Sequence, residues 1–287
     1  MKRMILIDGD IVAYQASAVT QRVFDWGDGN TSEVADLDEA LKIASRTIDK
    51  YMSDLFASDY VVALSDPDAN FRKGVLPTYK SNRKGVPKPV NYNAVRRYLL
   101  DEFDGKLKPG LEGDDIMGII QTSPEMYRGS EKIIVSIDKD MQTIPGLLYN
   151  PREGEVVEIT TAHAERYHLL QSVAGDIVDG YSGCPGVGMG KAIFIVDNCM
   201  GVRTYEHEFT RGARAGSTEI RNTPKQCDTV WEAIVSNYQA AKDTDRGNYE
   251  DAEQEALRQA RCARILRAED YNVSKGEVIL WTPPTEN

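Results

Sequence analysis

The chain has 287 residues, of which 41% are hydrophobic and 28% are charged, so it is long enough to bury one large core or two modest ones. Its net charge of −11 excludes nucleic-acid binding through bulk positive charge, and such binding would need a local basic patch. The four cysteines lie far apart and the three histidines form no ligand pattern, which argues against a disulfide framework and a zinc site. No apolar run has the length of a signal peptide or a membrane span, so we expect a cytoplasmic protein with no membrane partner.

Three short apolar runs, at residues 4–7, 60–64 and 132–137, predict buried parallel strands. Each run is followed by acidic residues, which are Asp8 and Asp10, Asp66 and Asp68, and Asp138 and Asp140. In open α/β sheets, ligands gather at the carboxyl ends of the strands. We therefore expect these carboxylates to lie close together at one edge of a sheet.

A fourth acidic group, Glu112, Asp114 and Asp115, stands directly before the apolar run that begins at Ile116. One interpretation is a helix start, where acidic side chains offset the positive end of the helix dipole, but one acid would suffice for that. Three neighbouring carboxylates repel one another and raise one another's pKa, and a cation relieves this repulsion. Their hard oxygen atoms suit Mg²⁺ or Mn²⁺. Together with the strand ends, the group indicates one shared acidic pocket.

The charge reverses between residues 69 and 100, a segment without Asp or Glu that contains eight Lys and Arg residues and several interleaved aromatic residues. Its prolines and glycines predict irregular structure, with a helix at its end. The plain interpretation is a solvated basic loop. Basic side chains beside aromatic rings, however, suit a phosphate backbone and unstacked bases, so we favour a nucleic-acid contact.

A glycine-rich stretch follows Asp176 and Asp179, which would share one face if that segment were helical. A turn between two helices exposes backbone amides that can hold a phosphate. The stretch is not a P-loop, because the spacing from Gly186 to Gly190-Lys191 is one residue short and Ala192 replaces the Ser or Thr that holds magnesium. A helix–turn–helix with a purely packing role is the alternative.

The other patterns predict scaffold elements. Residues 23–33 should form a hairpin with Asp28-Gly29-Asn30 at its tip, and residues 36–56 a helix with Asp36 as its N-cap. Short strands are expected at 147–149 and 156–159, followed by a helix over 162–170. Residues 201–224 are expected to be a loop, 228–242 and 249–268 to be helical, and 277–281 to form a strand.

Taken together, these segments resemble the 5′-nuclease family, which comprises flap endonucleases, the 5′-exonuclease domains of bacterial DNA polymerases and the 5′–3′ exonucleases of bacteriophages. The resemblance covers residues 4–192 and is carried by six motifs in the family's order. They are Asp8 after the first strand, Asp66 after the second, residues 71–83 of the basic arch segment, Gly110-Leu111-Glu112-Gly113-Asp114-Asp115, Ser136-Ile137-Asp138-Lys139-Asp140, and residues 175–188. Two positions depart from the family pattern: Gly180 stands where Asn is common, and Lys191 is shifted by one place.

The resemblance implies an α/β fold with a PIN-like parallel sheet flanked by helices and a helix–three-turn–helix element that binds DNA. Residues 1–170 would form the nuclease core, with the basic arch segment at about 69–100. Residues 171–287 would form the helix–three-turn–helix and a C-terminal helical region packed on the core.

The resemblance also implies the site residues. One Mg²⁺ would be held by Asp8, Asp66, Glu112, Asp114 and Asp115. A second would be held or oriented, partly through waters, by Asp138, Asp140, Asp176 and Asp179, with Mn²⁺ able to substitute. Two metals about 4 Å apart can activate the attacking water and stabilise the leaving oxygen, giving 5′-phosphate and 3′-hydroxyl products. The implied catalytic residues are Lys80, Arg83 and Asp115. The implied DNA-binding residues are Arg72, Lys73, Tyr79, Lys80, Arg83, Lys84, Gly186, Gly188 and Lys191, with Tyr79 stacked on a frayed base.

The implied activity is metal-dependent 5′–3′ exonuclease action on duplex DNA, with flap-endonuclease and RNA-primer-removing (RNase H-like) activity. Such an enzyme would act in phage DNA replication, recombination or host DNA degradation, in the host cytoplasm. The expected partners are double-stranded DNA with a 5′ end or flap, an RNA–DNA hybrid and replication proteins, and we expect a monomer.

Two other interpretations remain at this point. A haloacid-dehalogenase-type phosphatase would use Asp8 of Ile5-Leu6-Ile7-Asp8-Gly9-Asp10 as a covalent nucleophile, but it leaves the later acids and the basic segment unexplained. A non-catalytic DNA-structure-binding protein would have no use for so many carboxylates, which repel DNA when no metal is bound.

Overall fold

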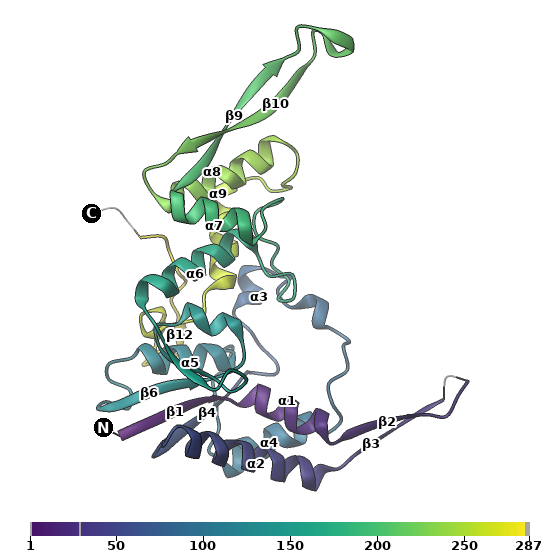
Figure 1. Ribbon diagram of the computed structural model, residues 1–287, viewed down its shortest axis with the longest axis vertical. Coiled ribbons are helices and arrows are strands. Elements are labelled where there is room, and N and C mark those ends of the chain that lie inside the picture. The colour runs from purple at the N-terminus through teal and green to yellow at the C-terminus, as the bar shows by residue number, and fades with distance from the viewer. Residues whose placement is uncertain (1, 29, 285–287) are drawn as a thin grey trace. The chain divides into compact units, whose positions relative to one another are not determined.

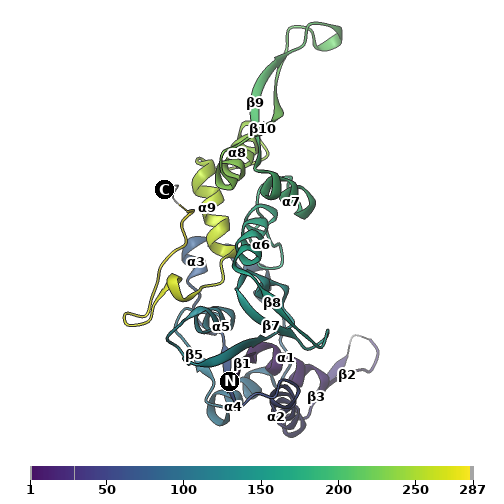
Figure 2. The same cartoon turned by 60° about the vertical axis from the view of Figure 1, so that its left-hand side comes forward.

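The computed structural model describes residues 2–28 and 30–284, and the chain divides into two compact units (Figures 1 and 2). The first unit comprises Met1–Phe71, Gly85–Ala164 and Ile265–Ile279. The second comprises Arg72–Lys84, Glu165–Arg264 and Leu280–Asn287. A single boundary at residue 170 therefore misses two segments: residues 72–84 belong to the second unit, and residues 265–279 return to the first.

The first unit is built on a six-stranded sheet in the order β5-β4-β1-β6-β7-β8. All neighbouring pairs are parallel except β7 with β8. The strands are β1 (Lys2–Asp8), β4 (Asp59–Leu64), β5 (Lys106–Leu107), β6 (Ser130–Val135), β7 (Gly146–Asn150) and β8 (Glu155–Ile159). The three predicted parallel strands are confirmed, although β6 ends before Ser136 and Ile137.

Helices cover both faces of this sheet, which confirms the predicted α/β class. Alternate residues of β1 show the two layers, because successive side chains of a strand point to opposite faces. Ile5 and Ile7 pack with α1 (Gly9–Val19), α2 (Leu37–Asp54) and α4 (Tyr92–Glu102), whereas Met4 and Leu6 pack with α5 (Gly113–Thr122). A strand buried on both faces must be apolar at every position, and each fully buried aliphatic side chain stabilises the fold by about 1.5–3 kcal/mol.

Other elements of the first unit were predicted from short sequence motifs. The side chain of Asp36 accepts the backbone N–H of Glu39 at 3.0 Å and caps α2 as predicted. Strands β2 (Gln21–Asp25) and β3 (Thr31–Ala35) form the expected hairpin, of whose tip Gly29 lies outside the described residues. The unit is completed by η2 (Lys139–Thr143), η4 (Ala268–Asp270), β11 (Tyr271–Asn272) and β12 (Glu277–Val278). The strand expected at 277–281 is thus only two residues long.

The second unit is mainly helical around its own core. It contains α3 (Arg72–Val75), η1 (Ser81–Arg83), most of α6 (Thr161–Ala174), α7 (Met189–Asn198), η3 (Gly212–Arg214), α8 (Val230–Asp243) and α9 (Ala252–Ala263). Val173, Ile195, Ile234 and Tyr238 lie in its core. Helix α9 ends at Ala263, so the helix predicted to reach residue 268 was too long.

The prediction of a loop at 201–224 was wrong, because these residues form most of a long antiparallel ribbon. Strands β9 (Met200–Glu208) and β10 (Thr218–Gln226) pair along their full lengths. Figures 1 and 2 both show the ribbon extending away from the helices of its unit. Most of its side chains are exposed on both faces, so the sequence lacks the apolar alternation that indicates a half-buried strand. Among the described helices, none combines the length and apolarity needed to cross a membrane.

Candidate functional site

Asp8 lies at the end of β1, where it also caps α1. Its side chain accepts hydrogen bonds from the backbone N–H of Ile11 at 3.1 Å and from Ser136 Oγ at 3.0 Å. Burial and the nearby charges of Asp10 and Asp138 raise the pKa of the Asp8 carboxyl to about 7, although both hydrogen bonds lower it. Asp8 is only 6% exposed, so its ionised form lies in a poorly solvated position beside other negative groups.

The negative charge of Asp10 is balanced by Arg96, which belongs to the basic segment that was expected to bind nucleic acid. Its carboxylate lies 2.9 Å from Arg96 Nε and accepts hydrogen bonds from Tyr92 Oη at 3.0 Å and from the backbone N–H of Ser65 at 2.8 Å. The Arg96 side chain is 9% exposed, so it belongs to the interior of the first unit. Asp10 thus connects β1 with α4 and with the end of β4.

The carboxylates that follow β4 and β6, Asp66 and Asp138, accept hydrogen bonds from backbone amides. Asp66 accepts the N–H of Gly110 at 2.7 Å and of Asp68 at 2.9 Å, and these hydrogen bonds hold the pKa of its carboxyl below the ordinary value. Asp138 accepts the N–H of Asp140 at 2.9 Å. The hydrogen bonds from Asp68 and Asp140 close local turns after the strands, whereas the one from Gly110 joins the loop after β4 to the segment before α5.

Ser136 lies at the centre of this edge of the sheet, and the sequence interpretation gave it no role of its own. Its Oγ donates to Asp8 and accepts the backbone N–H of Asp138 at 3.1 Å, so one hydroxyl connects the ends of β1 and β6. Ser136 is 3% exposed. The available signal was its position two residues before Asp138 in the S-x-D-K-D pattern.

Asp115 has a structural role that the sequence interpretation missed. It is fully buried, and its Oδ2 accepts the N–H of Glu112 at 3.0 Å, as part of a capping box at the start of α5. Its Oδ1 accepts the N–H of Leu266 at 3.1 Å. The structure therefore places Asp115 between α5 and the returning segment 265–279. Asp114, in the same helical turn, is half-buried.

The sheet brings the acidic residues of the first unit to one edge, because β4, β1 and β6 are parallel neighbours. It does not bring them to metal-binding distance: across residues 2–28 and 30–284, no three Asp, Glu, His or Cys side chains form a group that could hold an ion. Asp176 and Asp179, expected to share the pocket, belong to the second unit.

In the second unit, Asp179 is surrounded by cations. The Lys80 Nζ lies 3.5 Å from Asp179 Oδ2, and Arg83 pairs with Asp179 Oδ1. The backbone N–H of Lys80 also donates to the carbonyl of Asp179 at 2.7 Å. The two basic residues predicted to be catalytic are thus held by a carboxylate predicted to bind metal.

Arg72 and Tyr79, both predicted to contact DNA, are buried instead. Arg72 is 1% exposed and donates to the carbonyls of Cys262 at 3.1 Å and Arg264 at 2.6 Å. Tyr79 is 3% exposed, its ring stacks on Tyr181 at a centroid distance of 6.4 Å, and its hydroxyl donates to Asp179 at 3.3 Å. Base stacking requires an open ring face, so the structure does not support that role for Tyr79.

Asp176 and Asp179 do not share a helical face, because their segment forms a tight turn. Asp176 accepts the N–H of Val178 at 2.8 Å and of Asp179 at 3.3 Å, and its backbone pairs with Tyr181. Gly180 in this turn has φ of +77°, and a Cβ there would lie 2.6 Å from the Thr78 carbonyl oxygen. A side chain at position 180 would therefore require the backbone near Thr78 to shift, which favours glycine at this position.

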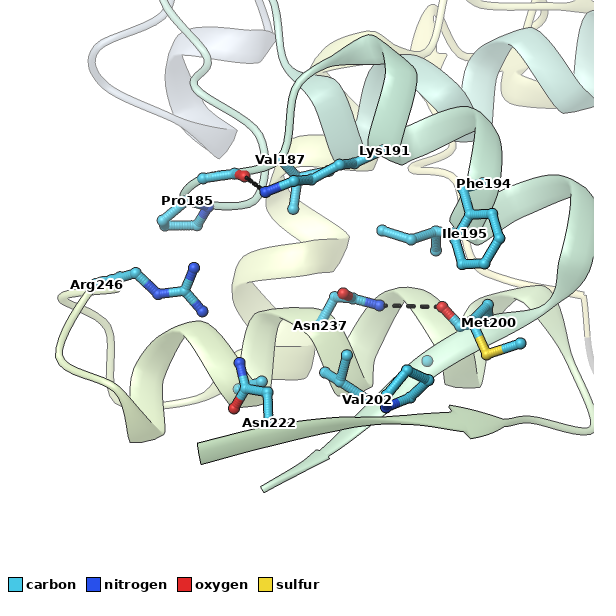
Figure 3. A pocket seen from close by; sticks show the side chains of 14 residues that line it. Pro185, Val187, Lys191, Phe194, Ile195, Met200, Val202, Asn222, Asn237 and Arg246 are labelled. Carbon is cyan, nitrogen blue, oxygen red and sulfur yellow. Dashed lines mark hydrogen bonds between the residues drawn. The ribbon is translucent and has the colours of Figure 1, made fainter. Parts of the chain in front are cut away.

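The glycine-rich turn before α7 borders a cavity of about 240 Å³ (Figure 3). The Lys191 Nζ donates to the carbonyl of Gly186 at 2.9 Å, so the shifted lysine braces the turn. Arg246 Nη1 lies 3.1 Å from the position that a Cβ of Gly186 would take. Arg246 lies outside every motif, and only the fold brings it to this turn.

Comparisons with known proteins show the family through its sequence model and its relatives, and the fold through a solved structure. Residues 3–161 match the family model described as the 5′-3′ exonuclease, N-terminal resolvase-like domain. The exodeoxyribonuclease of Enterobacteria phage T3 is 33% identical over 98% of this chain and 93% of its own, and the exonuclease of Escherichia phage T7 is 31% identical over 98% and 94%. The zinc-bound structure of T5 5′-exonuclease shares the fold, with a TM-score of 0.58 at 14% identity over 91% of this chain and 89% of its own. The chain therefore belongs to the 5′-3′ exonuclease family.

Proposed function

We propose that this protein is a metal-dependent 5′–3′ exonuclease that hydrolyses duplex DNA from its 5′ ends. The observation that carries the proposal is the buried carboxylate of Asp8 at the carboxyl edge of a parallel sheet, with its pKa raised to about 7 by burial and by its acidic neighbours. Perturbed carboxyl groups of this kind mark reactive and metal-binding sites. The phage T3 relative, named an exodeoxyribonuclease, supports DNA as the substrate.

The donor chemistry of this edge suits a hard divalent cation. Carboxylate oxygens are the ligands that Mg²⁺ and Mn²⁺ prefer, and a nearby cation would favour the ionised form that burial of Asp8 disfavours. The zinc in the T5 5′-exonuclease structure supports metal dependence in this fold. When bound, a divalent cation would supply Lewis acidity for hydrolysis of a phosphodiester, and we expect two such ions.

We propose Asp8, Asp114, Asp138 and Asp140 as the metal ligands of the first unit. Their side chains would have to reorient to bind, because no metal-binding group of three is preformed in the described part of the chain. Asp66 and Asp115 would act as positioning residues, because both oxygens of each carboxylate accept a backbone amide. Glu112 would position the start of α5 through its capping box.

The residues of this chain would divide the remaining work. Ser136 would hold the Asp8 side chain in its rotamer, and the Asp10–Arg96 pair would fix the turn after β1. We retain the proposal that Lys80 and Arg83 offset the negative charge of the reacting phosphate. Exposed cations predicted to bind DNA, which are Lys73, Lys84 and Lys191, would contact the backbone of the duplex without reading its sequence.

The test is release of product from three 5′-labelled substrates, a blunt duplex, a duplex with a 5′ flap and an RNA–DNA hybrid, in Mg²⁺ and in EDTA. Asp8→Asn is the informative variant, because its amide oxygen can still accept the Ile11 N–H and its NH2 can donate to Ser136 Oγ, while the charge is removed. Asp104→Asn is the matched control: its side chain is 93% exposed, and asparagine tolerates its left-handed φ of +47°.

We expect metal-dependent release from the 5′ end that Asp8→Asn abolishes and Asp104→Asn retains. The length of the first product separates exonuclease from flap-endonuclease action, and the hybrid tests removal of RNA primers. If none of the substrates is cleaved while a small phosphate monoester is hydrolysed, the proposal fails and Asp8 is a phosphatase nucleophile.

A further inference from the structure

The β9–β10 ribbon is a distinct basic element in an acidic chain. Residues 200–226 contain five Lys and Arg residues against three Glu, whereas the whole chain has a net charge of −11. Beyond its base, the ribbon has no role in the site described above.

The register of the two strands separates the charges onto opposite faces. Directly opposed residues of an antiparallel pair share a face, so Arg203, Tyr205 and His207 of β9 lie beside Thr223, Arg221 and Glu219 of β10. We refer to these six residues, together with Phe209, as the basic face. The other face carries Glu206 and Glu208, together with Val202, Thr204, Thr218, Ile220, Asn222 and Pro224.

The face that carries Glu206 and Glu208 is the one that meets the rest of the second unit at the base of the ribbon. Thr204 Oγ1 donates to Asp243 Oδ2 of α8 at 2.8 Å, and Val202 and Asn222 line the cavity in Figure 3. Lys225, on the same side of the ribbon near its base, pairs with Glu232 of α8 at 2.6 Å. Among the described residues, the seven of the basic face form ion pairs only with one another or with Arg214 at the tip of the ribbon.

Cations continue from the basic face to the tip of the ribbon. Arg203 and Arg211 are exposed, and within the described chain neither forms an ion pair. Arg214 and Arg221 share the single carboxylate of Glu219, and their guanidinium groups lie 3.8 and 5.1 Å from the centroid of the Phe209 ring. Two arginines with one carboxylate keep a net positive charge, and the ring holds them in place.

We propose that the β9–β10 ribbon is a duplex-binding arm, which places its basic face and its tip against the phosphates of DNA. This inference rests on the proposed action on duplex DNA. A two-stranded ribbon fits the major groove, which is about 12 Å wide. Nine residues per strand give the arm a length of about 30 Å, which corresponds to roughly nine base pairs. The contacts are to the backbone, so the arm adds affinity and carries no sequence preference.

The test is the salt dependence of duplex binding for the full chain, measured in EDTA so that no cleavage occurs. The variant is Arg203→Gln with Arg211→Gln, which removes the two cations that have no ion pair. Each lost phosphate contact should make the slope of log Kd against log salt shallower by about 0.9, so the double variant should lose about 1.8. Between 50 and 200 mM salt, the wild type should then weaken about tenfold more than the variant.

Two controls isolate the face. Lys42→Gln with Lys275→Gln removes the same charge from α2 and from the turn after β11, and should keep the wild-type slope. Glu206→Gln with Glu208→Gln changes the opposite face of the same ribbon, and this variant should also keep the wild-type slope. Slopes that are equal in the wild type and the arginine variant would overturn the proposal, as would an equal loss in the Lys42/Lys275 control.

The outcomes also separate this inference from the proposed function. If the arginine variant has a shallower salt slope than the wild type but the wild type releases no product in Mg²⁺, the nuclease proposal fails and the proposal of a DNA-binding arm stands. If the wild type cleaves duplex but the arginine variant has the same salt slope as the wild type, the proposal of a DNA-binding arm fails and the nuclease proposal stands. Duplex of four base pairs should show a smaller difference between variant and wild type than duplex of thirty, because it cannot span the arm.

Discussion

The substitution Asp8→Asn should stabilise the metal-free protein while it abolishes cleavage. The pKa of Asp8 rises from 3.8 to about 7 on folding, so between these values the folded chain binds a proton that the unfolded chain has released. The contribution of Asp8 to stability is therefore present below pH 3.8 and is lost as the pH rises through 7. The linkage relation gives a cost of about 2 kcal/mol at pH 5 and about 4 kcal/mol at pH 8. Asparagine does not titrate, so this cost disappears.

The assay is urea unfolding of both proteins in EDTA at pH 5 and pH 8. We expect the free energy of unfolding of the wild type to fall, relative to the variant, by about 2 to 3 kcal/mol between the two pH values. Saturating Mg²⁺ at pH 8 should narrow the difference, because the cation stabilises the ionised carboxylate only in the wild type. Parallel pH profiles for the two proteins would refute the argument from burial. A difference that Mg²⁺ does not change would show that Asp8 lies outside the metal site.

Three further predictions concern other residues and the metal. Lys80→Ala should lower turnover by about 10²-fold while duplex affinity falls little, because its charge acts on the reacting phosphate, and equal losses in single-turnover rate and Kd would contradict this role. Mg²⁺ at 100 times its Kd should stabilise the wild type by about 2.7 kcal/mol, seen as a higher Tm in calorimetry, and an unchanged Tm would argue against a carboxylate metal site. Asp115→Asn should destabilise the fold by about 1–3 kcal/mol, because one of the two amides on its carboxylate loses its acceptor. Unaltered urea unfolding together with lost activity would instead return Asp115 to the catalytic residues.

The sequence alone determined the features that depend on neighbours along the chain. The apolar runs at β1, β4 and β6 predicted buried parallel strands because a strand covered on both faces needs apolar residues at every position. Asp36 predicted the start of α2 because a cap acts on amides within one turn. The acids after these strands predicted the location of the candidate site, because parallel strands end at the same edge.

The tertiary structure alone decided which partner each side chain meets across long stretches of chain. Asp179 is paired with Lys80 and Arg83, and Arg72 is enclosed by the carbonyls of Cys262 and Arg264. Contacts between residues so distant in sequence leave no periodic signal, so an arginine in a basic segment predicts a DNA contact equally well whether it is exposed or buried. The β9–β10 ribbon was missed for a related reason: sheet periodicity is visible only where one face is buried, and here both faces meet solvent.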